Sequence, residues 1–336
     1  MPYLEQDGFG SAALIRTFDL RYDLLSALVE RWRLETHTFH FSCRECTVTL
    51  EDVVLQLGLP IDRSPVTGVS SFTDPAALCN QLLGDSPNDD EENFTSLKFT
   101  WLKAKFGQLS ANATEGELIV ISGVVDMGGC LTLLQSWTLY RMPFLASVTH
   151  QSYIYPLVNR WSIYPGIGRS HTVSIYRLMI EQYAGEGFIW MPHCYPKIIA
   201  VIPSSAYVRS EMWCTNAPII NFNVVEWYHG DRVLRQFGCI QYIPDPPCEV
   251  GAVHDINKRG KPQLDWGVKH QKFVAMWNNQ MGRRPQMVMA YSLQPSLEYI
   301  QWYYSCGKPY ILGGQSTVVP PHMQRPGGSY LAMTIF

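Results

Sequence analysis

The stretch THTFHFSCRECTVTLEDVVLQLGLPIDRSPVTG, from Thr36 to Gly68, decides the fold of the first third of the chain. It begins with an alternating segment that places Phe39 and Phe41 on one side and polar neighbours on the other. This two-residue period predicts a half-buried strand. Thr49 then precedes Asp52 by three residues, which is the spacing of a capping box at the start of a helix.

A short helix is predicted after this cap. Its buried face is marked by apolar residues at helical spacing, namely Leu50, Val53, Val54 and Leu57. Gly58 is placed to end the helix in the left-handed conformation, and Pro60 prevents its continuation. A strand, a capped helix and a Pro-Ile-Asp turn therefore form one compact unit.

This stretch contains several short sequence motifs in a fixed order, which we call words. ERW-x-x-E-T-H-T-F-H stands at Glu30–His40, E-C-T-V-T-L-E-D-V at Glu45–Val53, L-G-L-P-I-D at Leu57–Asp62 and V-T-G at Val66–Gly68. These words, in this order, resemble the plant mobile domain, a transposon-associated family that includes the MAIN-like and phosphatase-seven-long-form-like proteins. Later words of the family match at Met127–Trp137, Val224–Gly238 and Tyr299–Tyr304. The resemblance covers residues 10–305 as one domain and leaves residues 306–336 as a loosely structured tail.

The resemblance implies a non-enzymatic nuclear interaction module for meristem maintenance, transcriptional regulation and transposable-element silencing. It implies phosphatase-seven-like proteins as partners and no cofactor. The alternatives are a transposon-derived nucleic-acid-binding remnant and an accessory to a calcineurin-like phosphatase. The positions that match family words are Trp32, His37, Phe39, Thr49, Asp52, Gly58, Pro60, Trp137, Glu226, Trp227, Asp231, Arg232, Arg235, Phe237 and Gly238.

An internal segment of the family is missing from this sequence. Glu115–Val125 runs directly into the word at Met127–Trp137, whereas family members carry several further helices between these two pieces. We predict that a block on the order of seventy residues is absent around Val120–Val124, which corresponds to several helices of ordinary length. Helices that pack on this block would then expose apolar faces. We expect the shortened chain to be less stable than a full-length relative.

Composition describes an ordinary folded protein. The 336 residues are 46% apolar and 16% charged, and ten Trp and eighteen Tyr argue against disorder. A net charge of −3 gives no general reason to bind nucleic acid or an anionic membrane. No run approaches the roughly 18 apolar residues of a membrane span. Nine cysteines, an odd number, fit free thiols in a reducing, intracellular compartment.

The periodicity along the chain predicts a mainly α fold. Helices are expected at Leu24–Trp32, Phe94–Phe106, His171–Tyr183, Val224–Gly238, Leu264–Asn278 and Tyr299–Tyr304, and one also at Arg209–Trp213. Residues 84–93 are acidic and rich in turn formers, so they should be a solvated loop. We expect about eight to ten helices with a few short strands near residues 36–49. An α+β arrangement is the minor alternative.

A zinc site is the most tempting chemistry in the opening stretch. His37, His40, Cys43 and Cys46 are separated by two residues each, and all four are potential ligands. Strand alternation, however, places His37 and Cys43 on one face and His40 and Cys46 on the other, so they do not converge. Structural roles for the four residues are therefore favoured over a metal site.

Enzyme motifs are incomplete. A calcineurin-like phosphatase needs several metal-binding words, and only the fragment His229–Arg232 is present. Neither a pyridoxal lysine with its phosphate loop nor a G-x-S-x-G nucleophile is found. The polar residues of the later word, Glu226, Asp231, Arg232 and Arg235, could face a partner or a phosphate. The favoured interpretation is local ion pairs that fix packing, and the same holds for Trp32, Arg33 and Glu35.

Overall fold

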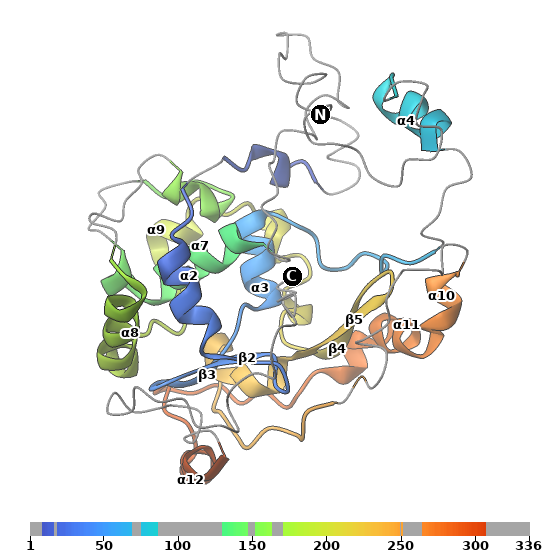
Figure 1. Ribbon diagram of the computed structural model, residues 1–336. Helices are drawn as coiled ribbons and strands as arrows, with labels where there is room; N and C mark the ends of the chain where they lie inside the picture. The colour runs from blue at the N-terminus through green and yellow to red at the C-terminus, as the bar shows by residue number, and fades with distance from the viewer. Residues whose placement is uncertain are drawn as a thin grey trace.

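The computed structural model describes residues 9–16, 19–68, 75–86, 130–146, 152–162, 171–248, 250 and 264–306. In these parts the protein is mainly helical, as the sequence predicts, and it has two small antiparallel sheets (Figure 1). The predicted helix at Phe94–Phe106, the junction at Val120–Val124, most of the acidic loop and the tail after residue 306 lie outside the described residues.

The regular elements are short, and single turns of 3₁₀ helix connect many of them. The α-helices are α2 (Tyr22–Val29), α3 (Leu50–Asp52), α4 (Pro75–Leu83), α7 (Leu131–Arg141), α8 (Val173–Gly187), α9 (Pro196–Ile199), α10 (Trp266–Lys269), α11 (Gln271–Asn278) and α12 (Leu297–Cys306). The 3₁₀ turns are η1 (Ala12–Leu14), η4 (Pro143–Leu145), η5 (Leu157–Trp161), η6 (Pro192–Cys194), η7 (Ser204–Tyr207), η8 (Ser210–Met212), η9 (Gly230–Phe237) and η11 (Gln280–Arg283), and η2 (Val53–Leu57) is a π-helical turn.

Helix α2 ends earlier than its sequence pattern predicts. The pattern extends to Trp32, but α2 stops at Val29 and Trp32 belongs to strand β1 (Trp32–Arg33). Trp32 pairs with Phe39 of β2 (Thr38–Phe41), and their rings meet edge to face with centroids 4.8 Å apart. Cross-strand aromatic packing therefore outweighs continuation of the helix.

The first sheet has the order β1-β2-β3, with β3 at Arg44–Cys46. Phe39 and Phe41 stack on one face of β2, as expected, and Phe39 also stacks on Trp137 of α7. The prediction of a half-buried strand is wrong, because every residue of β2 is buried. The polar face of the β2–β3 hairpin is covered by η9 and α12, which bring Arg232 and Tyr299 to Glu45 of β3.

The helix cap and stop follow the sequence closely. Thr49 and Asp52 form the capping box in both directions, and Gly58 adopts φ +68° in the left-handed region. Between them, α3 continues into the π-turn η2, and Leu50, Val54 and Leu57 are buried there while Val53 is half-buried. This confirms the predicted strand, cap and turn unit.

Helix α7 lies in the centre of the core, and α2 and α8 pack side by side next to it (Figure 1). Trp137 is completely buried in α7. Helix α8 turns Tyr176, Ile180 and Ala184 inward, in line with the predicted helix that begins near His171. One continuous apolar cluster therefore joins segments from the first, middle and last thirds of the chain.

The predicted helix at Val224–Gly238 is wrong in its first half. Val224–His229 is strand β5, which pairs with β4 (Asn216–Asn221) in the second sheet. Its β-branched and aromatic residues favour a strand once a partner strand is present, and β4 supplies that partner. Only the second half is helical: η9 is a broken 3₁₀ helix that ends at Gly238 with φ +73°.

The remaining C-terminal elements cover the sheets. The predicted helix at Leu264–Asn278 is present but divided at His270 into α10 and α11. Arg209 and Trp213 flank the single turn η8 and do not share a helix, which corrects that expectation. Helix α12 lies beside the β2–β3 hairpin (Figure 1), where the Tyr303 hydroxyl donates to the carbonyl of Phe41 at 3.2 Å.

Candidate functional site: buried carboxylate centres and a surface groove

A carboxylate without solvent contact lies at the junction of the hairpin, η9 and α12. Glu45 of β3 accepts hydrogen bonds from Arg232 Nη1 at 2.7 Å, from the Tyr299 hydroxyl at 3.2 Å and from Thr38 Oγ1 at 3.3 Å. His40 Nε2 lies 3.4 Å from the same carboxylate. These groups come from four family words, two in the opening stretch and two in the last third of the chain.

The electrostatics of this centre favour ionised Glu45. Burial alone raises the pKa of Glu45, but the hydrogen bond from His40 and the positive charge of Arg232 outweigh burial and hold that pKa below its usual value. Tyr299 shows the opposite effect, because burial and the neighbouring Glu45 charge raise its pKa well above normal. The centre is therefore a carboxylate bound by a guanidinium and a neutral phenol.

A second buried carboxylate joins the helix cap to the middle of the chain. Both oxygens of Asp52 lie 3.1 Å from Nη2 of Arg141, and Gln56 Nε2 donates to Oδ1 at 3.1 Å. His193 Nε2 lies 3.9 Å from the same oxygen. Arg141 also donates to the carbonyl of Trp190. The capping box thus has a second role as an ion-pair centre.

Asp52 is held ionised in the same way. Its complete burial favours the neutral acid, whereas the Arg141 and His193 charges and the Thr49 hydrogen bonds lower its pKa below the usual value. A buried pair of this kind loses several kcal/mol if one partner is removed, because the other charge is left uncompensated. Asp52 and Arg141 therefore contribute to the stability of the fold as a buried ion pair.

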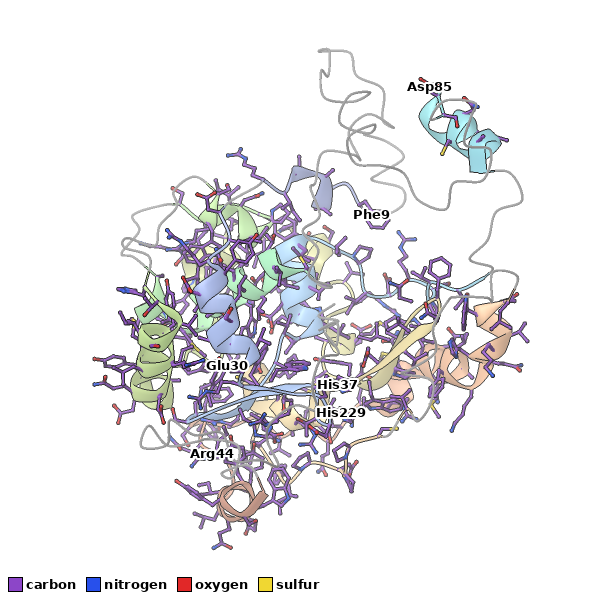
Figure 2. All side chains as sticks on the ribbon, in the orientation of Figure 1. Phe9, Glu30, His37, Arg44, Asp85 and His229 are labelled. Carbon is purple, nitrogen blue, oxygen red and sulfur yellow. The ribbon has the colours of Figure 1, made fainter. Side chains whose placement is uncertain are left out.

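A smaller histidine–glutamate contact connects the two sheets. His37 Nε2 lies 2.8 Å from Oε2 of Glu226, and the rings of His37 and His229 are stacked with centroids 6.0 Å apart (Figure 2). Burial, with the charges of Arg232 and His37, lowers the pKa of His229 to about 3. His229 is therefore neutral at physiological pH.

The other charged residues of the later word also point inward. Arg235 donates to the carbonyls of Leu293 at 2.6 Å and Cys43 at 2.9 Å, and its guanidinium stacks on Trp190 at 3.6 Å. Burial lowers the pKa of Arg235 to about 10. Asp231 accepts from the backbone of Asp245 at 3.0 Å, and burial raises its pKa. The expected local ion pairs are thus replaced by contacts between distant segments.

The four candidate zinc ligands lie at three different places. His37 has φ +52° and turns toward Glu226, while His40 faces Glu45. Cys46 pairs with Phe39 in register and its thiol contacts that of Cys43, so the two cysteines share a side. This corrects the sequence interpretation, which placed Cys46 with His40. In the described part of the chain, no three His, Cys, Asp or Glu side chains are arranged to hold a metal.

The apolar positions of the family words complete the core. Trp32 packs on Phe39, Trp137 stacks on Phe39 from the other side, and Trp227 lies under the guanidinium of Arg283 at 5.2 Å. Phe237 packs against the small cluster of Cys214, Leu234 and Cys239. The adjacent turn is close to its neighbours, since a Cβ added at Gly238 would lie only 2.9 Å from the Met191 sulfur.

The L-G-L-P-I-D word, by contrast, reaches the surface. Gly58, Pro60 and Asp62 line a groove of about 510 Å³ together with η1, Tyr155 and the segment from Ser205 to Trp213. Val208 is 69% exposed on its rim. Arg209 spans the rim between two acids, 3.9 Å from Asp62 and 3.6 Å from Glu211. Residues of this family word are therefore accessible from the surface.

The sequence alone does not reveal the two buried ion pairs, Glu45–Arg232 and Asp52–Arg141. Glu45 stands inside a matched word, yet nothing in its local pattern marks it as buried. Arg141 follows the family word that ends at Trp137, and its alignment with Asp52 needs the tertiary fold. The one available signal is the charge of Arg141 amid apolar neighbours, since buried charges are rare unless paired.

The comparisons with known proteins give one family model and several similar proteins. The model of the family described as "Plant mobile domain" matches residues 8–122 and 107–304. The "Serine/threonine-protein phosphatase 7 long form homolog" of Arabidopsis thaliana is 32% identical over 330 residues, which take in 77% of this chain and 24% of that protein. The chain thus spans about a quarter of the length of this relative.

Two further Arabidopsis thaliana proteins are similar. "Protein MAINTENANCE OF MERISTEMS" is 28% identical over 372 residues, with 91% of this chain and 74% of that protein covered. "Protein MAIN-LIKE 2" is 29% identical over 304 residues, with 72% of this chain and 45% of that protein covered. No solved structure matches. None of the helices in the described residues combines the length and apolar character needed to cross a bilayer.

Proposed function

This chain belongs to the plant mobile domain family, and we propose that it acts as a non-enzymatic protein-interaction module in the nucleus. Its roles would be those that the resemblance implies: meristem maintenance, transcriptional regulation and the silencing of transposable elements. The relative named for the maintenance of meristems supports the first role, since it aligns with 91% of this chain.

One observation carries the non-enzymatic part of the proposal. Three charged side chains of the family words form ion pairs inside the protein: Glu45 pairs with Arg232, and Asp52 pairs with Arg141 of α7. A catalytic acid or base must reach a substrate proton, and side chains with no exposed surface do not. Residues shared across the family therefore build the scaffold, and the groove beside Gly58–Asp62 is left as the surface for recognition.

The groove has the properties of a protein-binding surface. It joins exposed apolar side chains, such as Leu14 and Val208, to a rim of opposite charges at Asp62 and Arg209. An apolar centre with a polar rim is the usual anatomy of a protein interface. As the partner we propose a phosphatase-seven-like protein, in keeping with the resemblance and with the name of one relative.

The test is direct binding between the purified chain and a purified phosphatase-seven-like protein, followed by light scattering after gel filtration and by calorimetry. We expect a complex, and we expect Val208→Asp to weaken it at least about tenfold because a charge enters an apolar contact. Val268→Asp is the matched control, since Val268 is 73% exposed on α10 and does not line the groove. Its affinity should equal that of the wild type.

The outcomes separate the parts of the proposal. If no complex forms with either the chain or a version carrying the family's internal block, the proposed partner is wrong. If a complex forms and Val208→Asp binds as the wild type does, the groove is not the interface. Steeply salt-dependent binding to DNA would favour the nucleic-acid-binding alternative instead.

A further inference from the structure

The β2–β3 hairpin carries two cysteines that the proposed function does not use. Cys43 lies in the turn between Phe41 and Arg44, which pair with each other across the hairpin, and Cys46 ends β3. Both cysteines are buried, and their thiols are in contact. The same C-x-x-C spacing occurs in sites that alternate between a dithiol and a disulfide.

The two thiols differ in their access to solvent. Cys46 is completely buried and pairs with Phe39 inside the sheet, whereas Cys43 is 5% exposed. The neighbours of Cys43 in the turn, Ser42 and Arg44, are only half-buried. Burial and the adjacent Cys43 thiol raise the pKa of Cys46 well above its ordinary value, so Cys46 remains a neutral thiol. A small oxidant that enters at the turn therefore meets Cys43 first.

The carbonyl groups of this turn anchor two other elements. The Tyr303 hydroxyl of α12 donates to the carbonyl of Phe41 at 3.2 Å, and Nη1 of Arg235 in η9 donates to that of Cys43 at 2.9 Å. The guanidinium carbon of Arg44 also lies 5.4 Å from the ring centre of Tyr303. A shift of the turn therefore changes the contacts of both η9 and α12.

We propose that Cys43 and Cys46 form a reversible disulfide when a hydroperoxide reaches the turn, and that this bond loosens the contact of the turn with α12. The Cys43 sulfur attacks one oxygen of hydrogen peroxide, the O–O bond breaks, and the second oxygen leaves as water with the Cys43 proton. The Cys46 sulfur then displaces the hydroxyl group of the sulfenic acid, which leaves as a second water with the Cys46 proton. Two thiols are oxidised, and one peroxide is reduced to two waters.

The bond moves the turn rather than the strand. A disulfide holds its sulfur atoms closer together than two thiols in contact. Because Cys46 is fixed by its pairing with Phe39 and by complete burial, Cys43 makes most of the adjustment. The hydrogen bonds that the turn accepts from Arg235 and Tyr303 are weakened as a result. The switch requires no protein partner, and neither cysteine lines the groove at Gly58–Asp62.

Mass spectrometry of the full chain tests the disulfide directly, because trypsin cleaves after Arg44 and separates the two cysteines. The chain is treated with hydrogen peroxide under native conditions, and the remaining thiols are then alkylated in denaturant. We expect the tryptic peptides Leu34–Arg44 and Glu45–Arg63 to be joined, and to separate after treatment with dithiothreitol.

A second pair of cysteines serves as an internal control. Cys214 and Cys239 are both buried in one small cluster, as Cys43 and Cys46 are in the main core. Their thiols, however, donate to backbone carbonyls, that of Cys214 to Gly230 at 3.6 Å and that of Cys239 to Phe237 at 3.5 Å. Cys214 and Cys239 should therefore remain alkylated at the peroxide dose that joins Cys43 to Cys46.

Serine variants test the order of attack. In Cys46→Ser the oxidised Cys43 has no thiol to react with, so it should accumulate as a sulfenic acid that dimedone traps. In Cys43→Ser the buried Cys46 should give no dimedone adduct. If neither variant folds, the joined peptides of the wild-type chain and their separation by dithiothreitol decide the question.

Amide hydrogen exchange of α12 measures the structural effect of the disulfide. Exchange in Leu297–Cys306 should be faster in the oxidised chain than in the reduced chain, and peroxide should not change it in Cys43→Ser. The proposal is overturned if Cys43 and Cys46 stay alkylated at every peroxide dose that leaves the chain folded. It is overturned equally if dithiothreitol does not separate the peptides, or if exchange in α12 is the same in both redox states.

Discussion

The Glu45–Arg232 pair permits a quantitative test of how the distant family words are held together. Arg232→Met removes the guanidinium but keeps much of the apolar side chain. Glu45 then remains without solvent contact, with the Thr38 and Tyr299 hydroxyls and His40 beside it. Removing one partner of a buried pair costs about 3–5 kcal/mol. We expect the free energy of unfolding to fall by that amount at pH 7.

The reverse change and the double change complete a cycle. Glu45→Gln leaves Arg232 buried with a carbonyl partner at Asp245, 3.3 Å away, and should cost a similar amount. The double variant replaces both charged groups, so no uncompensated charge remains. The new side-chain amide oxygen still accepts hydrogen bonds from Tyr299 and Thr38. The loss in the double variant should therefore be smaller than the sum of the single losses by about 2–3 kcal/mol.

Urea unfolding followed by tryptophan fluorescence and circular dichroism at pH 7 gives these free energies. The pH dependence adds an independent check, because the pKa of Glu45 is lowered in the folded protein. Its stabilisation is present above the usual value of 4.5 and is lost as pH falls through the folded pKa. The reasoning is refuted if Arg232→Met costs less than about 1 kcal/mol or if the single losses add within about 0.5 kcal/mol.

Three further predictions concern other parts of the chain. Burial and the Arg232 charge lower the pKa of His229 from 6.5 to about 3, so the unfolded state alone gains a proton below pH 6.5. The free energy of unfolding should thus fall by up to about 1.4 kcal/mol per pH unit between pH 6 and 5, and His229→Gln should remove this slope in urea titrations. Gly58→Ala should cost more than the roughly 1 kcal/mol of a left-handed glycine, because its Cβ would lie 2.5 Å from Ser11 Cβ. Gly84→Ala, with φ +72° and no atom within 4 Å, should cost the backbone term alone, and urea unfolding of the two glycine variants measures the difference. Finally, the chain should bind 8-anilinonaphthalene sulfonate, and its melting temperature should be lower than that of a version with the internal block restored. A cooperative melt at an ordinary temperature without dye binding would contradict this.

The sequence predicts local geometry better than it predicts partners. Thr49, Asp52 and Gly58 set a cap and a stop through backbone chemistry within ten residues, so these local roles are predictable, whereas the pairing of Asp52 with Arg141 is not. The strand at Val224–His229 has spacing that also suits a helix, and its pairing with β4 is a tertiary property that this spacing does not carry. In the candidate site, too, the partners of the charged residues are set by tertiary contacts that the spacing does not carry.

Long-range pairing also explains why the polar residues are misassigned from sequence. Helical spacing predicts that Arg232 pairs locally, yet its partner Glu45 is 187 residues away in sequence. A single sequence specifies which side chains are charged, but not which of them meet. The resemblance to the family marks Glu45, Arg232 and Tyr299 as members of its words, but their contacts emerge only in the folded structure.

The lengths of the alignments bear on the predicted absence of an internal block. The alignment with the phosphatase 7 long form homolog is 330 residues long and takes in 77% of this chain, or about 259 residues, so it is about 70 positions longer than the matched part. The family model likewise matches in two overlapping pieces. Both observations support the prediction of a missing block, whose junction lies outside the described residues.

Helix α8 shows where such a block would make a difference. Opposite its buried face, α8 carries a short second apolar stripe formed by Ile175 and Leu178, which are 43% and 61% exposed. A helix that is apolar on two sides normally packs between two layers. The carboxylate centres at Glu45 and Asp52, however, are closed by residues that this chain retains. We therefore expect the shortened chain to keep its polar centres and to differ from its relatives mainly in surfaces such as this stripe.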